Sequence, residues 1–119
     1  MGKSIIKEKS FAVAVRMVNL SRFLQQEKKE FILSKQILRS GTSIGANVRE
    51  SLQAESRADF IHKLSIAHKE THETLYWLEL LKACNIIEEN HFNSIYPETV
   101  EVSKILSSII ITTKQKKDL

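Results

Sequence analysis

The segment Ser34–Glu50, SKQILRSGTSIGANVRE, contains two of the three glycines of the chain, four residues apart. Small residues surround them, as in a phosphate-binding loop, but apolar residues keep the spacing of one helix face through the whole segment. That stripe is Ile37, Gly41, Ile44, Val48 and Leu52. A loop does not preserve such a phase, so we predict a helix over residues 34–53 with Ser34 as its N-cap.

The two glycines need a packing reason inside a helix, because each disfavours the helix by about 0.8–1 kcal/mol relative to alanine. We expect Gly41 and Gly45 to let a neighbouring backbone approach closely. A Walker loop requires a lysine directly after its last glycine, whereas Ala46 and Asn47 follow Gly45. The segment is therefore not predicted to bind a nucleotide.

Three further segments show helical periodicity: residues 4–25, 57–84 and 89–114. One proline and three glycines among 119 residues, with 42% apolar residues, favour long helices around one core. Ser56–Asp59 has the form of a capping box before the third helix, and Asn85 is expected to end that helix. Pro97 is expected to kink or break the last helix near Ile95. We predict an all-α protein with a single domain, residues 1–119, of four helices.

The segment 4–25 is apolar on two neighbouring faces. The first stripe comprises Ile6, Val13, Met17, Leu20 and Leu24. The second comprises Phe11, Ala14, Val15 and Val18. An apolar surface this wide indicates burial on more than one side, as in a bundle whose helix also contacts another subunit.

Polar residues form a row on one face of the second helix: Arg39, Ser43, Asn47 and Glu50. Arg39 and Glu50 would lie about 16 Å apart along the axis and cannot pair with each other. Glu70 and Glu73, on the Trp77 side of the third helix, are expected to be half buried, and one of them is a candidate partner of Arg39. A solvated polar face is the alternative. The residues that we assign to packing or to a subunit interface are Arg39, Gly41, Ser43, Gly45, Asn47, Glu50, Glu70, Glu73 and Trp77.

Positive charge is concentrated in the first half of the chain. Residues 1–49 have a net charge of +7, residues 50–113 of −5 and residues 114–119 of +2. This distribution fits a basic face for nucleic acid, charge complementarity between subunits, or ordinary solvated helix faces. The first would bind phosphates and be sensitive to salt. The cations that we assign to it are Lys3, Lys7, Lys9, Arg16, Arg22, Lys28, Lys29, Lys114, Lys116 and Lys117.

Two histidines one helical turn apart, His68 and His72, are the sharpest metal candidate in the sequence. The zinc-protease pattern needs Glu directly after the first His, where this chain has Lys69, and no further His or Cys has suitable spacing. An exposed histidine pair is the preferred interpretation. The carboxylates Glu70 and Glu73 lack the second Glu-x-x-His helix of a di-iron bundle, and no activated nucleophile is recognisable. We expect no metal, no cofactor and no enzymatic activity.

The first seven residues lack the apolar core of a signal peptide, and the chain has no run of eighteen apolar residues. The single cysteine, Cys84, fits a reducing compartment and is expected to be a buried apolar filler. We therefore expect a cytoplasmic protein with no membrane partner.

Three segments carry a family resemblance: Gln36–Val48, Asp59–Ala67 and Glu73–Leu78, together with Glu70. They resemble the four-helix-bundle proteins encoded in intervening sequences of bacterial 23S rRNA genes. That family includes accessory proteins of diversity-generating retroelements. The resemblance covers nearly the whole chain, and the run Arg-Ser-x-x-Ser-Ile-x-x-Asn, which begins at Arg39, is its fairly specific part.

The resemblance implies a bacterial, cytoplasmic, antiparallel up-down-up-down four-helix bundle that assembles into a homopentameric ring. It also implies nucleic-acid binding and, in the retroelement branch, a reverse transcriptase as partner. We expect a non-enzymatic oligomeric accessory protein that binds RNA or DNA; the alternative is a homo-oligomeric scaffold for a protein partner such as a reverse transcriptase. The residues that match the characteristic positions of the family, as structural or interface residues, are Arg39, Ser43, Asn47, Glu50, Glu70, Glu73 and Trp77.

Overall fold

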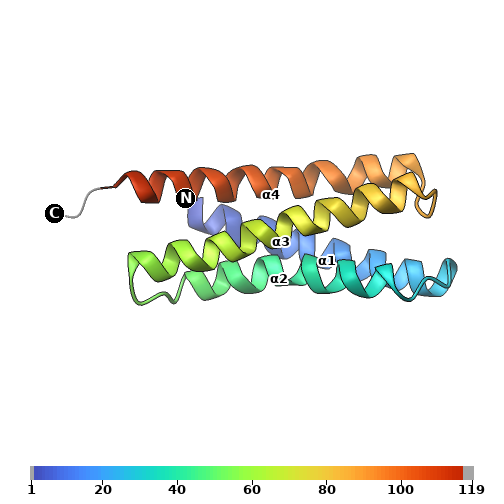
Figure 1. Ribbon diagram of the computed structural model, residues 1–119, viewed down its shortest axis with the longest axis horizontal. Coiled ribbons are helices and arrows are strands. Elements are labelled where there is room, and N and C mark those ends of the chain that lie inside the picture. Colours follow the sequence, from blue (N-terminus) through green and yellow to red (C-terminus); the bar gives the residue numbers. More distant parts are fainter. Residues whose placement is uncertain (1, 117–119) are drawn as a thin grey trace.

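The computed structural model describes residues 2–116 of the chain, and the side chains from residue 5 onward (Figure 1). This part of the chain forms four helices and contains no strand. The helices are α1 (Gly2–Glu27), α2 (Leu33–Ser51), α3 (Arg57–Ala83) and α4 (Glu89–Gln115). The all-α prediction is confirmed, and each predicted helix lies within two residues of the observed one at either end.

The four helices pack side by side into a bundle of 55 × 21 × 20 Å (Figure 1). Each helix contacts two others, in the order α1–α2, α2–α3, α3–α4 and α4–α1. Between α1 and α4, a residue later in one helix contacts a residue earlier in the other. Lys9 pairs with Glu101, and Arg16, farther along α1, pairs with Glu98. One hydrophobic core includes side chains of all four helices.

The apolar stripes predicted for each helix explain this core. All five members of the first α1 stripe, from Ile6 to Leu24, are buried, as are Ile37, Ile44 and Val48 of α2. On α4 the helix continues through Pro97, so of the predicted kink or break near Ile95 the break is wrong. Pro97 lies eight residues after Glu89, inside the helix, and has no backbone N–H to donate to the preceding turn.

The helix ends differ from the predictions at one important place. Ser34 is not the N-cap of α2, which begins at Leu33 with no cap from its preceding side chain. Instead the Glu30 carboxylate accepts hydrogen bonds from three backbone N–H groups, those of Ile32, Leu33 and Ser34, at 2.7–3.2 Å. An acid at this position also complements the positive end of the helix dipole.

The remaining ends follow the sequence. The Ser56 hydroxyl accepts a hydrogen bond from Asp59 N at the start of α3. Asn85 has a φ of 58° directly after this helix, the left-handed conformation that commonly ends helices. Cys84, the C-cap, is exposed, so its prediction as a buried filler is wrong.

Both glycines of α2 face α1. A Cβ atom on Gly41 would lie 2.4 Å from Met17 Cγ, far inside contact distance, so this glycine makes room for a side chain and not for the neighbouring backbone that we predicted. At Gly45 the nearest atom would be the backbone oxygen of Ser10 at 3.4 Å, an ordinary contact. Helix α2 thus packs on α1 through a glycine face, and its other face is left for α3.

Helix α1 packs less closely on α4 than the other neighbouring pairs do on each other. A groove of about 500 Å³ between them is lined by Ala12, Val13 and Val15 and spanned by the Lys9–Glu101 and Arg16–Glu98 ion pairs. The second α1 stripe remains largely uncovered, with Phe11 55% and Val15 44% exposed. Within the described residues, therefore, only the first α1 stripe is fully buried in the core.

Candidate functional site

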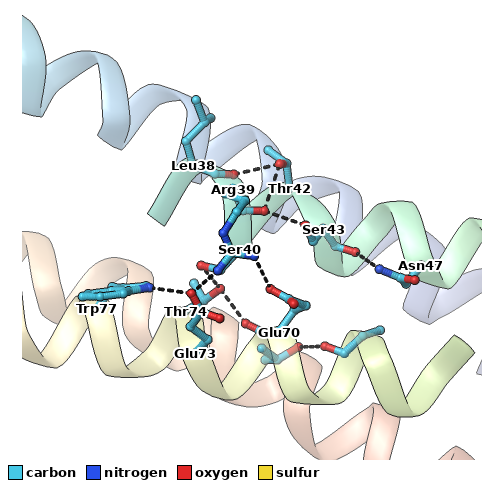
Figure 2. Close-up of polar contacts among 12 residues, drawn as sticks. Leu38, Arg39, Ser40, Thr42, Ser43, Asn47, Glu70, Glu73, Thr74 and Trp77 are labelled. Atoms are coloured by element: carbon cyan, nitrogen blue, oxygen red, sulfur yellow. Dashed lines mark hydrogen bonds and ion pairs between the residues drawn. The ribbon is translucent and has the colours of Figure 1, made fainter. Parts of the chain in front are cut away.

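A polar cluster joins α2 to α3 at the middle of the bundle (Figure 2). Arg39 donates through Nη1 to Glu70 Oε1 at 3.1 Å and through Nη2 to Glu73 Oε2. Trp77 Nε1 donates to the same Glu73 oxygen at 3.0 Å. The two carboxylates lie one turn apart on α3, so one planar guanidinium reaches both. The sequence predicted one acidic partner for Arg39, and the structure provides two.

The electrostatics of the cluster favour its ionised form. The hydrogen bond from Arg39, helped by that from Trp77, lowers the pKa of Glu73 against the opposing effect of burial. The side chains of Glu70 and Glu73 are 17% and 33% exposed, which confirms the half-buried prediction. Arg39 remains 50% exposed, so the cluster is an open surface rather than a closed ion pair.

A buried hydroxyl pair lies beneath this cluster. The Thr74 hydroxyl is 2.9 Å from that of Ser40 and donates to the backbone oxygen of Glu70 at 2.8 Å. Both side chains are fully buried. Sequence reasoning missed this pair, whose only signal was a small hydroxyl residue beside the apolar stripe of each helix. The pair fixes the register of α2 on α3 and thereby aims Arg39 at its carboxylates.

Aromatic side chains extend the cluster to the molecular surface. Tyr76 is 56% exposed and packs edge to face on the Trp77 ring, with centroids 5.0 Å apart. Tyr, Trp and Arg are the residues most enriched at energetically important positions of protein interfaces. Arg39, Tyr76 and Trp77, hereafter the α2–α3 surface, are held in place within the chain and remain accessible to a partner.

The other predicted interface residues lie elsewhere or bond within their own helix. Ser43 donates to the backbone oxygen of Arg39 at 2.7 Å, and Asn47 to that of Ser43 at 2.9 Å. Glu50 lies farther along α2 and pairs with Lys63 at 3.1 Å. Gly41 and Gly45 face α1, whereas Arg39 and Glu50 contact α3, so the predicted interface residues are divided between two helix–helix contacts.

The predicted nucleic-acid residues do not form one patch. Lys9 and Arg16 are engaged with α4 carboxylates, whereas Lys7 and Arg22 are exposed on α1 without an ion pair in the described chain. Exposed lysines occur at opposite ends of the bundle, two in the α1–α2 turn and two at the end of α4 (Figure 1). These are Lys28, Lys29, Lys114 and Lys116. The side chain of Lys3, and the whole of Lys117, lie outside the described residues.

The histidine pair lies on the opposite edge of α3, beside α4. Burial, followed by the proximity of His72, lowers the pKa of His68. Among residues 2–116, no group of three or more His, Cys, Asp or Glu side chains lies close enough to hold a metal ion. Ser103 of α4, which the sequence did not single out, lies within hydrogen-bond distance of both imidazoles.

A family model decides the classification of this bundle. The model, described as 23S rRNA-intervening sequence protein, matches residues 2–108. The chain belongs to the 23S rRNA-intervening sequence protein family. The resemblance seen in the sequence is thereby confirmed.

A solved structure agrees with this family assignment. It is the crystal structure of a protein of unknown function from the S23 ribosomal protein family of Bacteroides thetaiotaomicron VPI-5482. The two chains are 57% identical and superpose with a TM-score of 0.92, over 93% of this chain and 99% of the other. No curated protein is similar enough to match. Within the described residues of this intervening sequence protein, no helix is long and apolar enough to cross a lipid bilayer.

Proposed function

We propose that the protein is a non-enzymatic accessory factor of the bacterial cytoplasm that self-assembles and binds the phosphates of RNA or DNA. The observation that carries this proposal is a set of exposed cations along α1 and the turn that follows it, which have no carboxylate partner among the described residues. They are Lys7, Arg22, Lys28 and Lys29. Cations of this kind exchange bound counterions for phosphates, which favours binding at low salt.

Assembly is part of the proposal because one chain separates its basic residues. The α1–α2 turn and the end of α4 lie at opposite ends of a bundle 55 Å long (Figure 1). Several copies in a ring, a homopentamer in the form that we propose, would bring like ends together and bind multivalently. The same proposal includes an antiparallel up-down-up-down arrangement of the four helices. The ion pairs Lys9–Glu101 and Arg16–Glu98 support it, because the residue that lies later in α1 pairs with the residue that lies earlier in α4.

Fluorescence anisotropy with labelled single-stranded RNA, duplex RNA and duplex DNA tests the binding. We expect association at 50 mM salt and loss of at least tenfold in affinity at about 200 mM, because several phosphates are contacted. The double variant Arg22→Glu/Lys28→Glu should abolish binding. The matched control Lys69→Glu/Lys104→Glu makes the same change in net charge with exposed residues of α3 and α4 and should bind normally. Absence of binding at 50 mM salt would refute the proposal.

A protein-binding scaffold is the second candidate. The α2–α3 surface favours it, since Arg39, Tyr76 and Trp77 are accessible and already ordered by contacts within the chain. A reverse transcriptase is the partner that we propose. Binding of a purified reverse transcriptase from the same host, retained after nuclease treatment and lost in Tyr76→Ala, would favour the scaffold. Retention that depends on intact RNA would favour the first candidate.

A further inference from the structure

Three donor atoms of α3 and α4 converge at the edge of the bundle away from the α2–α3 surface. His68 Nε2 and His72 Nε2 lie 3.3 Å apart. Ser103 Oγ lies 3.3 Å from the first and 3.4 Å from the second. The helical spacing of the histidines brings the two rings together, edge to face with centroids 4.6 Å apart. The packing of α4 on α3 adds the hydroxyl.

The three distances match one face of a coordination tetrahedron. Zinc binds imidazole nitrogen at about 2.0–2.1 Å, and the ligands of a regular tetrahedron of that size are about 3.3–3.4 Å apart. The observed triangle has this edge on all three sides. A cation placed between the three atoms would accept a lone pair from each of them, whereas in a hydrogen bond between the imidazoles one nitrogen carries the hydrogen and the other accepts it.

The surroundings leave the site accessible. His72 is exposed and His68 partly so, while Ser103 is buried at the floor. An ion bound to the three atoms would retain one position open to water, as zinc sites with three protein ligands do. Lys69 and Lys104 neighbour the ligands in sequence and add positive charge nearby. Because no carboxylate or thiolate belongs to the triangle, the site should bind less tightly than structural zinc sites.

We propose that His68, His72 and Ser103 form a site for a divalent transition-metal ion of the class that imidazole binds, such as Zn²⁺, Ni²⁺ or Cu²⁺. The affinity should be highest for Cu²⁺. Mg²⁺ and Ca²⁺, which take oxygen ligands, should not bind. Such an ion would cross-link α3 to α4, a role separate from nucleic-acid binding.

Isothermal titration of the full-length, untagged chain with ZnCl₂ tests the proposal. We expect one saturable ion per chain. His68→Gln and His72→Gln should each weaken binding at least tenfold, and Ser103→Ala at least threefold. His62→Gln, at an exposed histidine of the same helix, is the matched control and should leave the affinity unchanged.

Two further measurements distinguish the site from weak surface binding. Co²⁺ in the same site should show the intense visible absorption of tetrahedral coordination, which His72→Gln should remove. At one fixed Zn²⁺ concentration the melting temperature of the wild type should rise more than that of Ser103→Ala, because stabilisation by a bound ion increases with its affinity for the native state. No saturable binding by the wild type, or equal affinity in the wild type and His72→Gln, would overturn the site. Unchanged affinity in Ser103→Ala would overturn the three-ligand geometry.

Discussion

At the scale of single residues, the two glycines of α2 have different roles despite their matching positions in the sequence. Gly41 leaves room for Met17, a fully buried side chain whose Cβ and Cγ atoms would lie inside contact distance of an added methyl group. Gly45 leaves only ordinary contact distance to the Ser10 backbone. The spacing of small residues predicted close approach at both, and the structure places the tight contact at one.

This difference predicts opposite effects of the same substitution. Gly45→Ala should stabilise the protein by up to about 1 kcal/mol, because alanine favours the helix and fits the space. Gly41→Ala should destabilise it by about 1 kcal/mol, since overpacking outweighs that gain. Urea unfolding measures both. Equal effects of the two alanine variants would contradict the close contact at Gly41. The larger substitution Gly45→Leu is expected to disrupt the packing of α1 on α2. Lys116→Ala, the control, is expected to leave the stability unchanged.

Tyr96 gives a second prediction at this scale. Its hydroxyl donates to Glu79 Oε2 at 2.6 Å, and this hydrogen bond, with burial, raises the pKa of Tyr96 to about 12. A raised folded-state pKa contributes stability below the unfolded value near 10, and that contribution is lost as pH rises toward about 12. Tyr96→Phe should therefore remove the phenolate absorbance step near pH 12. The variant should also lose less stability than the wild type as the pH rises from about 10 to about 12. An unchanged ultraviolet titration would refute the contact.

At the scale of the helices, apolar periodicity predicted all four elements because each helix buries one continuous stripe. The ends were harder to predict. Ser34 has the residue type of an N-cap, yet Glu30 performs the role from four residues earlier, since its longer side chain can reach forward to the first turn of the helix. Pro97 was expected to kink or break α4, but the helix continues through it.

The Glu30 cap has a measurable consequence. Glu30→Ala should destabilise the protein by about 1–2 kcal/mol, because three backbone N–H groups at the start of α2 lose their acceptor. Glu27→Ala removes a nearby exposed acid without such contacts and should stay within about 0.5 kcal/mol of wild type. Urea midpoints of the two variants decide the matter; a smaller effect at Glu30 than at Glu27 would exclude the capping role.

The candidate sites were predictable only as far as one helix determines them. The helical spacing of Glu70, Glu73 and Trp77 placed them on one face and indicated Arg39 as a partner. The contribution of Ser103 to the histidine pair depends on the register of α4 against α3, which neither segment specifies alone. Likewise the two α1 stripes looked equivalent, and only packing decides that Met17 is buried while Phe11 is exposed.

At the scale of the whole molecule, the uncovered α1 stripe is the feature that a single chain leaves unexplained. Phe11 lies under the Arg49 guanidinium at 5.3 Å, and Val15 lines the groove between α1 and α4. Exposed apolar residues beside one another on one helix are typical of surfaces that another molecule covers. A second copy of the chain is the occupant that the proposed assembly would supply.

The assembly can be tested without its ligand. Light scattering after size-exclusion chromatography should give a multiple of the 13.7 kDa chain mass for the wild type, five in the proposed ring. Val15→Glu should reduce that multiple while circular dichroism stays unchanged, because the side chain is not needed in the core. Ile111→Glu is the control, because Ile111 is also an exposed aliphatic residue but lies near the end of α4. A wild-type monomer at every concentration would exclude self-assembly.

Trp77 is the only tryptophan of the chain, and its indole N–H is bound to the carboxylate that Arg39 also binds. The tryptophan fluorescence of the protein therefore arises from one place, the contact between α2 and α3 (Figure 2). A change in emission during refolding would time the docking of these two helices apart from the rest of the chain. A molecule that covers the neighbouring Tyr76 would alter the same signal, so the protein carries its own unlabelled optical probe of folding and of binding.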